Sequence, residues 1–203
     1  MEFMMKKQFR FYVALVASLL ITACSTSVER LSADQQIDLS GVWNDTDSRL
    51  VSREMVEDAL SRPWITKFVS AQGKEPVVIV GRIKNLSHEH INTNTFIANI
   101  ERELINSGEV QFVASASDRQ EIRDERADQD LNASEATRKE MGQEAGADYI
   151  MQGQINSIID LDGTTQVRFY QVNLELISIK DNRKVWIGDK KIKKLIKNSK
   201  IRQ

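Results

Sequence analysis

Glycine and proline are scarce in this chain, and the scarcity constrains its fold more than any single motif does. Nine glycines and two prolines make up 11 of the 203 residues, about 5% against the roughly 12% of average proteins. Because these residues supply most tight turns, the composition favours long helices and strands and excludes collagen-like and linker-type chains. With 41% hydrophobic residues, the chain can build one packed domain with a short appendage.

The only cysteine, Cys24, ends an N-terminal segment that has the pattern of an export signal. Basic residues within 1–10 precede an apolar run over 11–21. This run is shorter than the ~20 residues that a membrane-spanning helix needs. The order Ile21-Thr22-Ala23-Cys24 resembles the bacterial lipobox, in which the cysteine is acylated and becomes the first residue after cleavage. The alternative is a free thiol beside an ordinary cleavage site.

The lipobox interpretation predicts a lipoprotein of the outer membrane that faces the periplasm. Residues 1–23 would be the signal peptide, Cys24 would carry palmitate and other acyl chains, and 24–38 would form a short tether. Two or more acyl chains anchor a protein stably, whereas one does not. Ser25 follows the cysteine, and by resemblance to enterobacterial sorting it argues against inner-membrane retention. The tether contains no proline and spans at most about 45 Å.

Apolar periodicity predicts alternating helices and strands over 39–203. A helix capped by Asp45, Asp47 or Ser48 ends or restarts at Pro63, and further helices are predicted over 93–107, 117–132 and 134–145. The predicted strands are 77–80, 110–113, 148–159, 166–179 and 185–187. This order is typical of one α/β or α+β domain with a mixed sheet, flanking helices and a C-terminal antiparallel meander. The apolar run Val77–Val80 is typical of a strand buried on both faces.

Charge is distributed unevenly along the chain. From Lys180 to the C-terminus there are ten basic and two acidic residues, which suggests a basic tail that makes an electrostatic contact. The alternative is a terminal strand whose charges protect a sheet edge. The dense charges over 117–132 predict an exposed helix.

Few residues in the sequence suggest an enzyme. Phosphate-binding and dinucleotide-binding loops and the GxSxG elbow are absent. His88-Glu89-His90 contains metal-binding residue types, but the zincin pattern requires a second histidine at position 92, which is Asn. A metal-dependent envelope enzyme built on His88 and His90 would need a third ligand that the sequence does not identify. We expect loop histidines without a metal, and tryptophans that belong to the core or cover the sheet: Trp43, Trp64 and Trp186.

Five short blocks occur in collinear order across roughly 39–194. They are Leu39-Ser40-Gly41-x-Trp43-Asn44-Asp45-Thr46-Asp47-Ser48, Gly81-Arg82-x-x-Asn85 with Glu89-His90-Ile91, Leu104-Ile105-Asn106-Ser107-Gly108, Gly146-Ala147-Asp148-Tyr149-Ile150-Met151-Gln152-Gly153 and Lys184-Val185-Trp186. Together they resemble the LpoB family of penicillin-binding protein activator lipoproteins. The resemblance implies one domain over 39–203, similar to the N-terminal domain of TolB. It implies no active site, no cofactor, no metal and no nucleic-acid partner.

The resemblance also implies an outer-membrane lipoprotein that binds and activates a bifunctional, class A penicillin-binding protein. The best-known activators have a long proline-rich tether, whereas the tether here is short. We expect Asn85, Glu89 and His90 to contact the partner, because loops at strand ends display contact residues. The competing interpretation is that Asn85 holds a turn and His90 caps the next helix. The alternative function is a structural or binding lipoprotein that contacts peptidoglycan or outer-membrane assembly factors without activating a synthase.

Overall fold

The computed structural model describes residues 27–32, 35–134 and 144–197, and the chain divides into a unit over 1–35 and a unit over 36–203. The described residues of the first unit form neither helix nor strand. The predicted signal peptide, Cys24 and nearly all of the helix predicted over 134–145 lie outside the described residues. All features below belong to the second unit.

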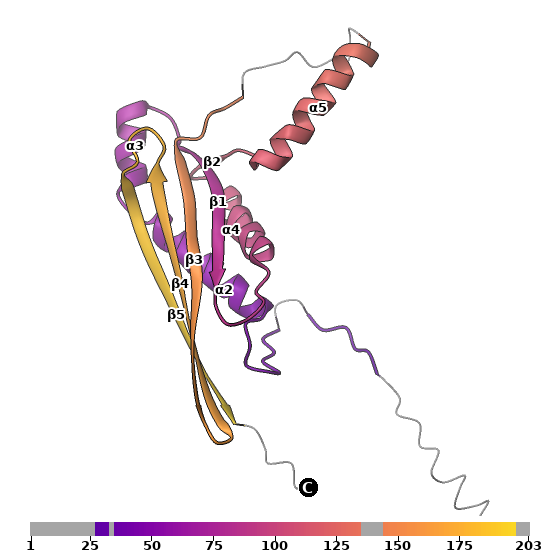
Figure 1. The fold of residues 1–203 in the computed structure, drawn as a ribbon. Helices are drawn as coiled ribbons and strands as arrows, with labels where there is room; N and C mark the ends of the chain where they lie inside the picture. The colour runs from indigo at the N-terminus through magenta and orange to yellow at the C-terminus, as the bar shows by residue number, and fades with distance from the viewer. Residues whose placement is uncertain (1–26, 33–34, 135–143, 198–203) are drawn as a thin grey trace, which may run out of the picture. The chain divides into compact units, whose positions relative to one another are not determined.

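Apart from the helix predicted over 134–145, which lies almost wholly outside the described residues, the second unit has the predicted order of elements. In chain order they are α2 (Asp45–Leu60), α3 (Trp64–Gln72), β1 (Val77–Leu86), α4 (Thr93–Ser107), β2 (Gln111–Phe112), α5 (Ala116–Asn132), β3 (Tyr149–Asp162), β4 (Thr165–Ser178) and β5 (Lys184–Lys197). The strands form one sheet in the order β2-β1-β3-β4-β5 (Figure 1). Strand β1 is parallel to β2 and β3, while β3, β4 and β5 are antiparallel. The predicted mixed sheet with a C-terminal meander is therefore confirmed.

The core lies between the sheet and helices α2 and α4, which cover one of its faces (Figure 1). Apolar residues at helical spacing in α2 and α4 pack against the inward-facing residues of β1, β3 and β4. They include Val51, Met55, Val56, Phe96, Ile100, Leu104, Val78, Met151, Ile155, Val172 and Leu174. Trp64 and Trp186 are buried, and Trp43 packs against this core, as the sequence predicted.

Strand β1 departs from the prediction in length and in burial. It continues through Leu86, and a β-bulge between Val80 and Ile83 inserts one residue relative to β3. Val78 and Val80 are buried, but Ile79, which alternation places on the opposite face, is only half-buried. The prediction that both faces are buried is therefore wrong at Ile79, because the helices cover only one face.

The first helix begins with a capping box at Asn44, before all three N-cap candidates that the sequence offered. The Asn44 side chain accepts a hydrogen bond from the Asp47 amide at 3.0 Å, and Asp47 Oδ2 accepts one from the Asn44 amide at 3.0 Å. Asn44 is therefore the N-cap, and Asp47 is its partner at the third helical position. The predicted N-caps Asp45, Asp47 and Ser48 are wrong.

The two charged segments form different elements, an exposed helix and an edge strand. Helix α5 has no buried residue among those described, which confirms the predicted exposed helix, and its arginines lie near Glu144. The basic C-terminal segment is not a tail as far as Lys197, because it forms the 14-residue edge strand β5. A lysine-rich edge discourages pairing with other chains, so the structure supports the edge-protection alternative.

Gly153 of β3 allows β3 and β4 to approach closely, and this leads to a first prediction. A Cβ atom at position 153 would lie 2.1 Å from the Asn173 carbonyl oxygen. Gly153→Ala is therefore expected to lower the free energy of unfolding by about 1–3 kcal/mol, measured by urea denaturation. Gly146→Ala is the control, because its Cβ meets no atom within 4 Å. Equal stabilities of the two variants would contradict the prediction.

Candidate docking site

The predicted contact loop follows β1 and lies beside β3 and β4. It begins after Leu86, and the backbone amide of His88 donates to Ser157 Oγ of β3 at 2.9 Å. The His88 Nδ1 atom is also 3.0 Å from Ser157 Oγ. The loop is thereby fixed to the central strand of the sheet before it reaches Glu89.

Glu89 places its carboxylate inside the domain and not at its surface. The side chain is 14% exposed and forms an ion pair at 2.5 Å with Arg168 of β4, which is 17% exposed. Its oxygens also accept hydrogen bonds from Tyr170 Oη at 2.7 Å and from the Trp43 amide at 3.1 Å. A largely buried carboxylate with three donors joins the loop, β4 and the segment before α2.

The phenol of Tyr170 is one of the donors to Glu89. Burial raises the pKa of the Tyr170 phenol well above its ordinary value, and the hydrogen bond to Glu89 adds to this effect. Tyr170 therefore stays protonated and donates to Glu89. Trp43 packs edge-on against Tyr170 with a centroid distance of 5.6 Å, so the donor is fixed by packing as well.

Asn85 holds the turn of the loop. Its side-chain amide donates to the Glu89 carbonyl at 2.7 Å, and its oxygen accepts from the Ser87 amide at 3.0 Å and the Ser87 hydroxyl at 2.6 Å. These are the bonds of an Asx turn. The structure thus supports the interpretation of Asn85 as a turn-holding residue.

His90 is the predicted residue that remains available at the surface. It is exposed, and its ring forms no hydrogen bond with any residue in the described ranges. The interpretation of His90 as the cap of the next helix is wrong, because the N-cap of α4 is Asn92, whose side chain accepts from the Asn94 amide at 3.1 Å. Leu86, which is 54% exposed, is the last residue of β1 and lies four residues before His90.

No metal-binding cluster is present in the part of the chain that the structure describes, where no three His, Cys, Asp or Glu side chains are grouped to hold an ion. Within the same residues, no helix combines the length and the apolar character that crossing a membrane requires.

Lys194 of β5 fixes the N-terminal segment of the domain beside this loop. Its ammonium group contacts Asp38 at 2.7 Å, Asp47 at 2.6 Å and the Val42 carbonyl at 3.2 Å. Burial alone would lower the pKa of Lys194, but the hydrogen bonds to Asp38 and Asp47 outweigh burial and raise it. The chain therefore enters the domain against the C-terminal half of β5.

Two residues that complete this site, Ser157 and Arg168, were not predicted from the sequence. The Asp162-Gly163 turn signal could have placed Ser157 opposite Tyr170, since a hairpin turn sets the register of its strands and the two residues are paired. No sequence signal connects Glu89 to Arg168, which lies 79 residues later.

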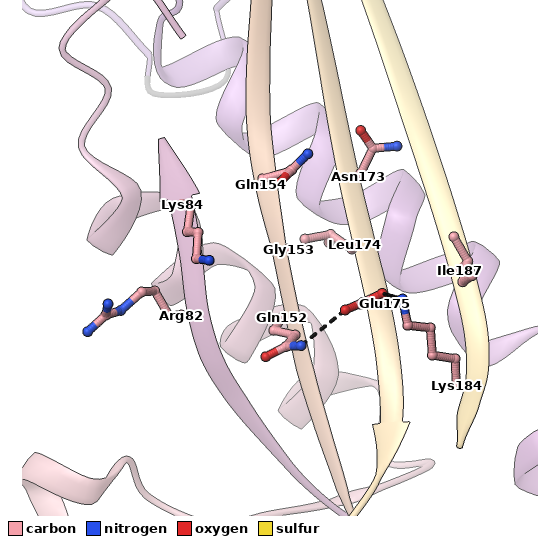
Figure 2. Close-up of a pocket in the computed structure, with 10 residues that line it drawn as sticks. All are labelled: Arg82, Lys84, Gln152, Gly153, Gln154, Asn173, Leu174, Glu175, Lys184 and Ile187. Atoms are coloured by element: carbon pink, nitrogen blue, oxygen red, sulfur yellow. Dashed lines mark hydrogen bonds and ion pairs between the residues drawn. The ribbon is translucent and has the colours of Figure 1, made fainter. Parts of the chain in front are cut away.

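A concave surface lies on the sheet face that the helices leave open. It has a volume of about 370 Å³ and is lined by amide and charged side chains from β1, β3, β4 and β5 (Figure 2). Gln152 donates to Glu175 at 3.0 Å, and Glu175 is paired with Lys184 at 2.5 Å. Arg82 and Lys84 lie on the β1 side of this surface (Figure 2).

Comparisons with known proteins identify similar chains. A family model described as "Peptidoglycan-synthase activator LpoB" matches residues 47–192, which is more than two thirds of the chain. No curated protein sequence matches the chain significantly. Two solved structures illustrate the similarity. The LpoB C-terminal domain from Salmonella enterica is 17% identical with a TM-score of 0.35, and the match covers 64% of this chain and 93% of that chain. Lipoprotein GNA1162 from Neisseria meningitidis is 15% identical with a TM-score of 0.41, and the match covers 62% of this chain and 88% of that chain.

Proposed function

Because this chain belongs to the LpoB family of peptidoglycan-synthase activators, we propose that it is an outer-membrane lipoprotein that binds and activates a class A penicillin-binding protein. The family match over residues 47–192 is the observation that carries the proposal. The family is described as an activator of peptidoglycan synthase, and the proposal assigns this chain a regulatory role and no reaction of its own. Activation requires that the chain bind the active conformer of the synthase more tightly than the inactive conformer. A difference of about 1.4 kcal/mol between the two binding free energies shifts the ratio of the conformers tenfold.

The proposed membrane attachment depends on Cys24, the only thiol of the chain. Cys24→Ser is expected to abolish acylation and to leave an uncleaved or soluble periplasmic form, because no other residue can carry the thioether. Palmitate labelling and membrane fractionation measure this. Normal labelling of the variant in the outer-membrane fraction would contradict the anchor, and Ser25→Ala is the matched control.

We propose that the synthase contact lies on the segment from Leu86, the last residue of β1, to Ile91 at the end of the loop. The exposed His90 ring and the half-exposed Leu86 offer a polar and an apolar contact, and such pairs are typical of docking surfaces. Asn85 and Glu89 hold this loop through bonds within the domain. Their contribution to binding is therefore expected to act through the position of His90.

His90→Ala is expected to weaken synthase binding and activation about tenfold, with a melting temperature within about 2 °C of the unchanged chain. The reason is that an exposed side chain contributes to an interface without contributing to the core. Binding is measured with purified synthase, and melting by circular dichroism. Leu131→Ala on α5, where Leu131 is 84% exposed, is the control. Unchanged binding of the His90 variant would remove His90 from the contact surface.

The open sheet face favours a second candidate function, binding of peptidoglycan without activation. Its amide groups and the cations Arg82 and Lys84 match a polymer that carries amides and carboxylates. Sedimentation of the chain with purified sacculi tests this second function. A protein that only activates the synthase need not bind peptidoglycan, the product of the synthase, and so need not sediment with sacculi. Sedimentation that Lys84→Glu abolishes, without any synthase binding, would favour this second function.

A further inference from the structure

A groove lies between α3 and the turn that joins β4 to β5. It has a volume of about 720 Å³ and is lined by residues of α3, the starts of β3 and β5, the end of β4 and the β4–β5 turn. In Figure 1, α3 and this turn lie at the end of the sheet opposite the β3–β4 hairpin. Neither the family match nor the predicted contact loop assigns a role to it.

The floor of the groove is aromatic and rigid. The Tyr149 ring packs edge-on against Trp64 with centroids 5.0 Å apart and against Phe68 with centroids 5.6 Å apart. Trp64 Nε1 donates to the Ala59 carbonyl at 2.7 Å, which fixes the indole. Ile179, at the rim, is 48% exposed. The groove therefore offers a preformed apolar surface to an apolar side chain.

The rim of the groove is basic. Five cations line it, namely Lys67, Lys74, Lys180, Arg183 and Lys184. Its two carboxylates are engaged, since Asp148 accepts from the Val77 amide at 2.9 Å and Asp181 is paired with Arg183 at 2.6 Å.

Three of the five cations are unpaired among the residues that the structure describes. Lys67, Lys74 and Lys180 are exposed and form no ion pair with a residue in the described ranges. The excess positive charge beside an apolar floor complements a ligand that carries carboxylates next to apolar side chains.

The groove is also far along the sheet from the point where Lys194 holds Asp38. Lys194, which binds Asp38, is paired with Arg168 of β4. The groove begins at Ser178, ten residues after Arg168 on the same strand. At about 3.3 Å per residue, these points are about 33 Å apart. If the chain is anchored through Cys24, the groove lies at the end of the domain away from the point where the tether enters.

We propose that this groove binds an acidic segment of the synthase that also carries apolar side chains. The proposal rests on the proposed function and adds a contact at the opposite end of the sheet from His90. Two linked contacts on one partner raise the overall affinity, because the second forms at a high effective concentration. The carboxylates of the segment would meet Lys67, Lys74 and Lys180, and an apolar side chain would lie on the Trp64–Tyr149 floor.

The test compares two triple variants with the same change in charge. Lys67→Glu/Lys74→Glu/Lys180→Glu alters the groove, and Lys191→Glu/Lys193→Glu/Lys197→Glu alters exposed lysines of β5 far from it. Each is made in the chain from residue 24 with Cys24→Ser, which retains the complete unit over 36–203. The probes are a fluorescein-labelled peptide of alternating Glu and Phe, followed by anisotropy, and purified synthase.

We expect the groove variant to bind both probes at least tenfold more weakly, while the β5 variant stays within threefold of the unchanged chain. All six lysines are exposed or half-exposed, so both variants are expected to melt normally. Equal losses in the two variants, or no loss, would overturn the groove proposal. Groove-dependent binding of phosphatidylglycerol vesicles but not of the peptide would also overturn it, because it would assign a lipid.

The two probes separate this proposal from the proposed function. Groove-dependent binding of the peptide, with no binding of synthase by the unchanged chain, would support an acidic-segment site and contradict the synthase as partner. Equal synthase binding by the unchanged chain and by the groove variant would support the activator function and overturn the groove as its contact.

Discussion

Val78→Asp is expected to destabilise the domain strongly, because it places a carboxylate in the core. Val78 is 1% exposed, lies in the core and belongs to β1, which is flanked by β2 and β3. Because Val78 belongs to the hydrophobic core cluster, a carboxylate there is expected to lower the free energy of unfolding by at least about 4 kcal/mol. Domains of this size have about 5–15 kcal/mol in total. Urea denaturation and thermal melting measure the loss, which corresponds to about 8–16 °C.

Ile79→Asp is the matched control for this prediction. It introduces the same group one residue later, on the sheet face that the helices leave open, where Ile79 is only half-buried. The new carboxylate can reach water, so its cost is expected to be less than about half that of Val78→Asp. Equal stabilities of the two variants would contradict the assignment of the covered and open faces.

Glu89→Ala is expected to destabilise the domain by about 3 kcal/mol. The substitution leaves the guanidinium of Arg168, which is 17% exposed, without its carboxylate and removes the acceptor of Tyr170. A largely buried charge that loses its partner costs about 3–5 kcal/mol. The expected decrease in melting temperature is about 6–12 °C, measured together with synthase binding. Any loss of binding is expected to follow the loss of stability.

A double-mutant cycle shows whether Glu89→Ala destabilises the domain by breaking the ion pair with Arg168 or by removing side-chain volume. If the ion pair dominates, Glu89→Ala/Arg168→Ala is expected to be more stable than the sum of the single variants predicts, because the orphaned charge is gone. Additive effects would show that the pair contributes little. A Glu89→Ala variant with unchanged stability and weakened synthase binding would instead support Glu89 as a direct contact residue.

Much of the fold was predictable because it depends on local pattern. The spacing of Phe96, Ile100 and Leu104 places one helical face in the core, and Asp162-Gly163 joins two long strands with an exposed turn. These signals need only neighbouring residues, so the order of elements, the mixed sheet and the antiparallel meander followed from them. The family assignment depended on the same kind of collinear local information.

The sequence by itself determined the elements, their order and the family, since these depend on residues that are close in the chain. Only the tertiary structure decided that Ile79 lies on an open face, that β5 extends to Lys197 and that Glu89 is enclosed. Burial depends on which helices cover which face, and an ion pair between Glu89 and Arg168 depends on strands that meet from 79 residues apart. A carboxylate in a loop has the same sequence pattern whether it faces a partner or a buried guanidinium, because its surroundings are fixed only when the sheet assembles.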